Sequence, residues 1–274
     1  MPTTARTQAI LFLALALYTV FNLIPIIWAG LTSIKYPVDA FTIPPTLFFT
    51  PTLDFHYQVW VEKEFWVYLV NSMVISCAVV CISVPIGTLA AYALSRSRTV
   101  HTRSILFGLL TVRMFPHILL ALPFFIMGKY LGLIDTYLLM VLAIVAINQP
   151  FTIWLMRSFL VDVPIELDEA ARIDGCNDWQ VFWKVVLPVV RPGLVVTALF
   201  SLLLSYNEFL FALVLTGAET KTLPVAIAEY GAENIAYWSL SAAGAVGIMA
   251  PIVVFMLFAQ RHLVRGLTFG AVKG

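Results

Sequence analysis

Few side chains in this sequence could carry out covalent or metal chemistry, and their spacing does not bring them together. Cys77 and Cys81 lie one helical turn apart in an apolar run, but no histidine or carboxylate is near enough in sequence to complete a metal site. No serine–histidine–aspartate set suggests nucleophilic catalysis, and no G-x-x-x-x-G-K-[ST] phosphate-binding loop occurs. The sequence therefore predicts no catalytic residue, no metal and no cofactor on this chain.

Polar side chains inside long apolar runs indicate a different kind of chemistry. Arg113 lies in one such run and Glu208 in another. A charged group at the centre of a membrane helix costs about 2.5–3.5 kcal/mol on insertion scales, so such groups usually face a cavity or a partner. Five further polar side chains fall near one middle layer: His117, Asn148, Gln149, Tyr206 and Asn207. These seven residues are candidates to line a pathway for a polar solute.

Other roles stay open for the same residues. Polar side chains in membrane helices also hydrogen-bond neighbouring helices and hold them together, and Asn148 and Gln149 suit this role. Arg113 and Glu208 could instead serve gating or subunit pairing. With a rise of about 1.5 Å per residue, Arg113 lies about 12 Å and Glu208 about 24 Å from the same side of the membrane, so a direct pair between them is not expected.

The elements that must position these side chains are hydrophobic segments. The chain of 274 residues is 61% hydrophobic and only 11% charged, whereas roughly a quarter of a soluble domain is charged. Six nearly charge-free runs are long enough to cross a bilayer as helices: residues 9–34, 67–94, 105–127, 137–156, 192–215 and 239–260. The sequence predicts an all-α integral membrane protein with six transmembrane helices in a single domain, residues 1–274. The net charge of +1 gives no argument for nucleic-acid binding.

The distribution of basic residues predicts the orientation. An even number of spans puts both termini on one side, and that side carries 11 lysine and arginine residues against 4 on the other. The positive-inside rule places the richer side in the cytoplasm. Both termini and the long loop 157–191, between spans four and five, are therefore predicted to be cytoplasmic.

The long cytoplasmic loop has the pattern of two short helices. The range Pro164–Asp174 begins with a proline, carries acidic residues in its first turns and is followed by Gly175, a natural left-handed stop. Asn177 and Gln180 have the spacing of a capping box, which predicts a second helix to about Leu187.

The first of these helices needs a surface to lie on, because an isolated helix of about 11 residues is marginal in water. That surface is either the chain's own membrane helices or a separate soluble partner. Ala170 and Ala171 leave a small-residue patch that permits close approach, and Asp168 and Glu169 beside it could pair with basic groups on a partner. A solvated linker is the remaining alternative.

The segment "EAARIDGCNDWQVFWKVVLP" (169–188) resembles the EAA signature of ATP-driven importer permeases: Glu-Ala-Ala, three residues, Gly, nine residues, an aliphatic residue, one residue, Leu-Pro. The signature residues here are Glu169, Ala170, Ala171, Gly175, Val185, Leu187 and Pro188, with Val185 where isoleucine is usual. The stretches "YNEFLFALVLT" (206–216) and "KTLPVAI" (221–227) and the tail "QRHLVRGLTFGAVKG" (260–274) are similar to the maltose-type, sugar-importing subgroup. The likeness covers nearly the whole chain.

The resemblance implies a permease subunit of a binding-protein-dependent importer in a bacterial inner membrane. The loop 157–191 would hold a coupling helix that docks on a cytoplasmic ATPase dimer, and ATP and Mg would bind that partner rather than this chain. Further partners would be a second permease subunit, expected to be non-identical, and an extracytoplasmic substrate-binding protein. The substrate would be a sugar, oligosaccharide or polyol, and Tyr206 could present its ring to a sugar face. The tail with Arg261, Arg265 and Lys273 would, by this resemblance, lie against the ATPase; anchoring to anionic lipid is the alternative.

Two alternatives stay open. One is an importer for glycerol phosphate or another sugar-like anion, which Arg113 favours. The other is a self-contained secondary carrier, which the EAA signature and the lack of an evident inverted repeat disfavour.

Overall fold

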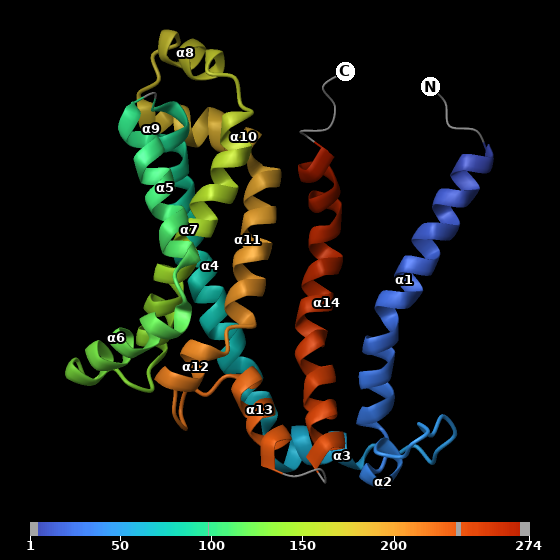
Figure 1. The fold of residues 1–274 in the computed structure, drawn as a ribbon. Helices are drawn as coiled ribbons and strands as arrows, with labels where there is room; N and C mark the ends of the chain where they lie inside the picture. The colour runs from blue at the N-terminus through green and yellow to red at the C-terminus, as the bar shows by residue number, and fades with distance from the viewer. Residues whose placement is uncertain (1–4, 98, 234–236, 269–274) are drawn as a thin grey trace. The chain divides into compact units, whose positions relative to one another are not determined.

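The computed structural model describes residues 5–97, 99–233 and 237–268, and in these ranges every regular element is a helix (Figure 1). The all-α prediction is confirmed. The chain divides into two compact units, which are described separately: Met1–Trp66 with Ala226–Ala250, and Val67–Val225 with Pro251–Gly274. The single permease domain stays a prediction.

The first unit contains the N-terminal helices. They are α1 (Ala5–Ser33), α2 (Pro37–Ala40), α3 (Asp54–Tyr57) and the π-helix η1 (Gln58–Glu62). Two later helices, α13 (Leu223–Glu233) and α14 (Trp238–Thr268), have residues in both units. In this unit Lys35 is buried, donates to the Thr46 carbonyl at 2.7 Å and lies over the ring of Trp28. The burial of its charge is thus balanced by a carbonyl and an aromatic face.

The second unit contains the helices that hold the candidate site residues. They are α4 (Phe65–Arg96), α5 (Val100–Met114), α6 (His117–Tyr130), α7 (Tyr137–Val161), α8 (Glu166–Ile173), α9 (Asp178–Gln180), the π-helix η2 (Val181–Val186), α10 (Leu187–Val189), α11 (Arg191–Tyr206) and α12 (Leu210–Leu215). Only the first two residues of α4 belong to the other unit.

Among the described residues, four helices are long and apolar enough to cross a membrane. They are Arg6–Ser33, Phe65–Arg96, Tyr137–Val161 and Trp238–Leu257. Two further spans are possible if each of two bent helix pairs counts as one: His101–Met114 with His117–Tyr130, and Asp178–Val189 with Arg191–Tyr206. The structure thus accommodates up to six spans.

The predicted run 105–127 is not one straight helix. It is divided between α5 and α6, whose axes differ by 88°. Pro116 causes the break, because proline has no backbone N–H and disfavours the helical conformation in the residue before it. Phe115 accordingly has an extended backbone, with φ −68° and ψ 135°.

The predicted run 192–215 is also interrupted. α11 ends at Tyr206, residues 207–209 leave the helix, and α12 begins at Leu210. The fourth run, predicted to end at residue 156, continues as helix to Val161, so the loop predicted from residue 157 begins at Asp162. We call residues 162–190 the EAA segment.

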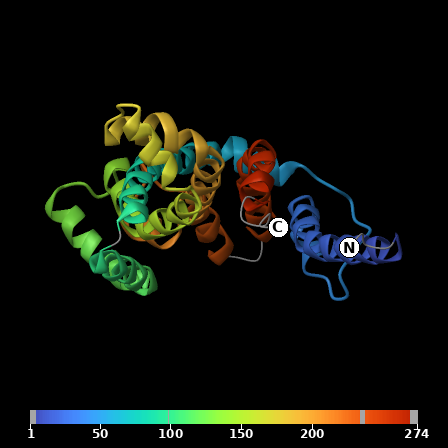
Figure 2. The ribbon, with the colours of Figure 1, turned by 90° about the horizontal axis from the view of Figure 1, so that it is seen from above.

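α7 is the central helix of the second unit. It packs against α5, α11 and α12, and α7 and α11 lie side by side (Figures 1 and 2). Its apolar side chains enter two buried clusters, one containing Ile144 and the other Met156. α4 contributes Val79 to the first cluster and Ala91 to the second. Helices α4 and α7 therefore contribute side chains to both buried clusters of this unit.

Gly87 permits the close approach of α4 to α7. A Cβ at residue 87 would lie 2.5 Å from Thr152 Cγ2, and Thr152 is fully buried. We expect Gly87→Ala to lower stability by about 1–3 kcal/mol, the usual cost of overpacking, seen as a lower unfolding midpoint in detergent. The control is Gly108→Ala, because nothing lies within 4 Å of its added Cβ. Equal midpoints for the two variants would contradict this packing.

Candidate functional site

The EAA signature lies in a unit of helix, glycine turn and helix. α8 forms the first helix, two residues shorter at its start than predicted, and α9, η2 and α10 form the second. Gly175 has φ +87°, and the Cys176 N–H donates to the Ala171 carbonyl at 3.0 Å, as in a Schellman motif. Asn177 and Gln180 form the expected capping box, with reciprocal bonds of 2.9 and 3.0 Å. The local structure predicted for this unit is confirmed.

The two faces of α8 have different surroundings. Asp168 is fully buried and Ala171 nearly so, and Ala171 packs in a cluster with Leu160 and Val181. Glu169 and Ala170 are exposed. Because successive helical residues are about 100° apart, the EAA triplet is divided between the two faces. Of these three residues, only Glu169 and Ala170 are available to a partner.

Asp168 is paired inside the chain. Its carboxylate accepts from Arg96 Nε at 2.9 Å and from Arg96 Nη2 at 3.0 Å, and the Tyr92 hydroxyl donates to it at 2.8 Å. The hypothesis that Asp168 pairs with a basic partner is therefore wrong, because its side chain is already enclosed and neutralised. Neither Tyr92 nor Arg96 was singled out in the sequence, since nothing local connects residues more than 70 positions apart.

Five large apolar side chains on the EAA segment are exposed: Leu167, Ile173, Trp179, Trp183 and Val189. The most exposed of them are Ile173, with 87% of its surface exposed, Trp179 and Trp183. The rings of Trp179 and Trp183 contact each other at 5.8 Å between centroids. Large apolar side chains exposed in a polar segment are typical of an interaction surface. These side chains lie between charged residues in the sequence. This was a signal of an exposed surface, but the EAA signature does not include them.

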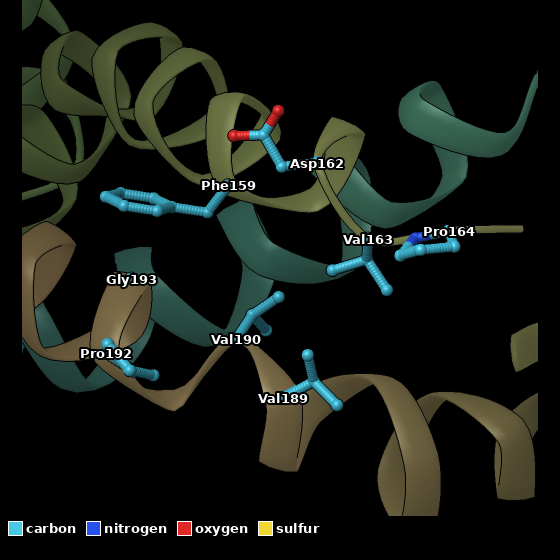
Figure 3. A pocket seen from close by; sticks show the side chains of 8 residues that line it. All are labelled: Phe159, Asp162, Val163, Pro164, Val189, Val190, Pro192 and Gly193. Carbon is cyan, nitrogen blue, oxygen red and sulfur yellow. The ribbon is translucent and has the colours of Figure 1, made fainter. Parts of the chain in front are cut away.

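A small apolar cavity lies where α7 ends and α11 begins (Figure 3). Its volume is about 130 Å³, and Val163 and Val190 are buried in its wall. The Asp162 carboxylate points away from Val190. A Cβ on Gly193 would lie 2.5 Å from Phe159 Cγ, so the glycine permits the ring to pack there. This lining is suited to holding the two helices together.

Asn148 and Gln149 bond to neighbouring helices. Asn148 is buried and donates to Ser205 Oγ at 3.2 Å, which joins α7 to α11. Gln149 accepts from Ser83 Oγ at 2.9 Å, which joins α7 to α4. These bonds satisfy polar groups that would otherwise be costly in an apolar environment. A place for these two side chains on the solute pathway stays a prediction.

The other predicted pathway residues lie at or near the two helix breaks. Arg113 lies over the Phe151 ring at 5.4 Å, and His117 begins α6 and contacts the Phe211 ring edge-on at 6.4 Å. Glu208 Oε1 accepts from the Phe211 N–H at 3.1 Å and so caps α12.

Tyr206 and Asn207 end α11 in contrasting ways. Tyr206 is 1% exposed, and its hydroxyl has no hydrogen-bond partner within the described residues. Asn207 is exposed and donates to the Leu203 carbonyl at 2.9 Å. Breaks of this kind are tolerated at membrane depth where protein or a water-filled cavity surrounds them.

A second carboxylate organises the loop between α12 and α13. Asp135 accepts from the backbone N–H groups of Gly217, Glu219 and Thr220 and from the Thr220 hydroxyl, at 2.7–3.0 Å. Burial alone would raise the pKa of Asp135. The four hydrogen bonds outweigh burial and lower this pKa to about 2. The sequence analysis did not identify Asp135, although a lone aspartate between turn residues was a signal.

Residues of α4 and α7 also bond to the loop between α12 and α13. The Asn71 amide donates to the carbonyls of Glu219 and Lys221 at 3.1 and 2.9 Å, and the Tyr137 hydroxyl donates to Asn71 Oδ1 at 2.6 Å. Ser72 Oγ accepts from the Leu223 N–H at 2.9 Å. The start of α4 is thus bonded to the loop that leads into α13.

Metal ligands are not clustered in the part of the chain that the structure describes: no group of three or more histidine, cysteine, aspartate or glutamate side chains could hold an ion. In the C-terminal tail, Lys273 and the side chains of Arg261 and Arg265 lie outside the described residues.

These helices belong to a known family. The model of the binding-protein-dependent transport system inner membrane component family matches residues 83–269, and the chain belongs to this family. It is 37% identical over 251 residues to the permease protein y4oR of Sinorhizobium fredii, covering 92% of this chain and 90% of that one. It is 35% identical over 260 residues to the trehalose permease protein SugB of Mycobacterium tuberculosis, covering 93% of each chain.

Two further relatives extend the comparison. The trehalose/maltose permease protein MalG of Thermococcus litoralis is 33% identical over 271 residues, covering 97% of each chain. A crystal structure of a bacterial ABC transporter involved in import of the acidic polysaccharide alginate matches with a TM-score of 0.75 and 25% identity, covering 96% of this chain and all of that one. The chain is therefore an integral membrane permease subunit of an ABC importer and not an enzyme. Nucleotide binding belongs to a separate ATPase subunit, and a self-contained carrier does not fit this family.

We expect the Asp135 contacts to fail in acid. Because the folded pKa of about 2 lies below the unfolded value of about 3.9, the stabilisation is present above pH about 4 and is lost as the pH falls through about 2. Unfolding midpoints in detergent should show wild type above Asp135→Asn at pH 6, with the difference shrinking across that window. Glu219→Gln, a carboxylate change in the same loop, is the control. A difference between wild type and Asp135→Asn that does not vary with pH would contradict this assignment.

Proposed function

We propose that this chain is one of two permease subunits that form the membrane path for a sugar, oligosaccharide or polyol, and that its EAA segment couples the path to the ATPase. In this arrangement the ATPase contact is made by Glu169, Ala170 and Gly175. The part of the segment that holds this contact in place includes Ala171, Leu187 and Pro188. An extracytoplasmic binding protein delivers the substrate.

The observation that carries this proposal is the two-sided character of α8. One face is fixed by a buried ion pair and apolar packing, and the other presents Glu169 and Ala170 to solvent. A helix of eight residues is too short to be stable alone, so its own chain supplies the rigidity and its free face is available for docking. Ile173, Trp179 and Trp183 add exposed apolar surface to the same segment.

The substrate class rests on the relatives. Two relatives that match over nearly the whole chain length are named for trehalose transport and for trehalose/maltose transport. The helix breaks near His117 and Asn207 give irregular backbone beside polar side chains, which suits a surface that lines a cavity. The residues we assign to this path are Arg113, His117, Asn148, Gln149, Tyr206, Asn207 and Glu208.

Charge and exposure support the proposed orientation and the proposed second subunit. The positive-inside rule favours cytoplasmic termini and a cytoplasmic EAA segment in a bacterial inner membrane. The apolar window of α1 is not buried within this chain, and side chains such as Phe12 and Phe21 are about three-quarters exposed. Lipid and a second, non-identical permease subunit would cover this helix.

A sugar-like anion is the second candidate substrate. Arg113 supports it, because a guanidinium at the break between α5 and α6 is suited to binding a carboxylate or phosphate. One importer structure with a similar fold is of a transporter involved in the import of the acidic polysaccharide alginate. Uptake assays in proteoliposomes with labelled trehalose, maltose and glycerol phosphate distinguish the two candidates. We expect uptake of a neutral sugar; uptake of glycerol phosphate alone would replace the neutral substrate with an anion.

We expect Glu169→Lys to release the ATPase or to uncouple its hydrolysis from the binding protein, because it changes the charge of the exposed face by two units. Gly175→Arg should act in the same direction, since a side chain at its φ of +87° costs roughly 1 kcal/mol. The measurements are ATPase copurification and binding-protein-stimulated hydrolysis in proteoliposomes.

Two control variants separate an effect on the EAA segment from an effect of the substitution itself. Glu219→Lys makes the same charge change in the loop between α12 and α13, and Gly175→Asn keeps a residue that tolerates a left-handed turn. Both should retain the ATPase. Normal association and normal stimulation in Glu169→Lys and Gly175→Arg would remove the coupling role of the EAA segment.

A further inference from the structure

One guanidinium in the second unit joins three helices. Arg96, at the end of α4, holds the Asp168 carboxylate of α8 with two of its nitrogens. Its third nitrogen, Nη1, donates to the carbonyls of Leu160 and Val163, at the end of α7, at 3.3 and 3.1 Å. The Asp168 side chain is 1% exposed and that of Arg96 is 15% exposed. All three guanidinium nitrogens are therefore engaged, and water has little access to the pair.

The geometry of this pair fixes direction as well as distance. A bidentate arginine–carboxylate contact holds both planar groups in one relative orientation, whereas apolar packing alone permits sliding. A buried ion pair is weak evidence for stability, because desolvation offsets much of the attraction, but such pairs can specify one arrangement. Here the arrangement specified is the rotation and position of α8 against the end of α4.

Tyr92 extends the contact to the second half of the EAA segment. Its hydroxyl donates to Asp168, and its ring contacts Phe182 in η2 at 5.1 Å between centroids. Phe182 is itself buried. Both halves of the EAA segment are thus held by neighbouring residues of α4, one turn apart.

The opposite end of α4 is bonded to the loop that leads into α13. Asn71 and Ser72 hold the loop 219–223 through three hydrogen bonds, and the 32 residues of α4 span about 48 Å at 1.5 Å per residue. One continuous helix therefore connects the EAA segment with the loop that precedes α13.

We propose that Arg96, Asp168 and Tyr92 are positioning residues that make α8 and α4 move as one body, so that a displacement applied by the ATPase at Glu169 is delivered along α4 to the loop 219–223. This inference rests on the proposed coupling function of the EAA segment. It adds a specific route, because α8 would otherwise be displaced on its own without moving a membrane helix.

The test is a distance measurement on the complete importer in lipid nanodiscs. Spin labels are placed at Ala93 and Glu166, both exposed, in a background with Cys77, Cys81 and Cys176 replaced. In the otherwise wild-type chain we expect the distance between α4 and α8 to be the same without nucleotide and after vanadate trapping with MgATP. A shift larger than the width of the distance distribution would overturn the proposal, whatever the stability of any variant.

Variants of the pair provide the functional arm. Asp168→Asn keeps the side-chain size and Arg96→Lys keeps the charge, but both lose the bidentate contact. The ATPase should still copurify with both variants. Stimulation of ATP hydrolysis by the binding protein should fall about tenfold, within the range for mutations along coupling routes. The matched control is Asp178→Asn, which breaks the exposed Arg172–Asp178 pair of the same segment and should leave the Ala93–Glu166 distance distribution unchanged.

The outcomes separate this inference from the proposed function. Normal stimulation in Asp168→Asn together with uncoupling in Glu169→Lys would overturn the rigid link and leave the coupling role of the EAA segment in place. No effect of Glu169→Lys on association or stimulation would contradict the coupling role itself. Broadened Ala93–Glu166 distances in Asp168→Asn, with reduced stimulation and a retained ATPase, would support the link.

Discussion

A carboxylate enclosed by protein has to be paired and hydrogen-bonded, and Asp168 meets this requirement with the guanidinium of Arg96 and the hydroxyl of Tyr92. The arrangement of the EAA segment depends on this contact. It turns Asp168 and Ala171 toward the chain's own helices and thereby turns Glu169 and Ala170 outward. A segment with too few residues to fold alone thereby becomes a fixed surface, as the ATPase contact that we propose for it requires.

Other polar groups of the second unit are also paired within the chain. Asn148 and Gln149 bond across helix interfaces, and Glu208 caps a short helix after a break. Asp135 gathers four donors at the loop before α13. Tyr206 differs, because its buried hydroxyl has no partner in the described part of the chain. Its position on the solute path stays a proposal.

The sequence predicted the features that local patterns determine. Apolar runs gave the helices, and Gly175 and the Asn177–Gln180 box gave the turn and the cap of the EAA segment. Pro116 lies within the run 105–127, but the 88° bend between α5 and α6 depends on tertiary packing and could not be read from that run. The pairing of Arg96 with Asp168 joins positions far apart in sequence, so no local pattern could indicate that Asp168 faces inward while Glu169 faces outward.

The central claim is that the exposed face of the EAA segment carries the ATPase contact while its inner face stays bound to α4. A cryo-electron microscopy reconstruction of the assembled importer tests this most directly. We expect ATPase density against Glu169 and Ala170, with Asp168 still bonded to Arg96. An ATPase that contacts another part of the chain, or that binds Asp168 after the pair has opened, would contradict it.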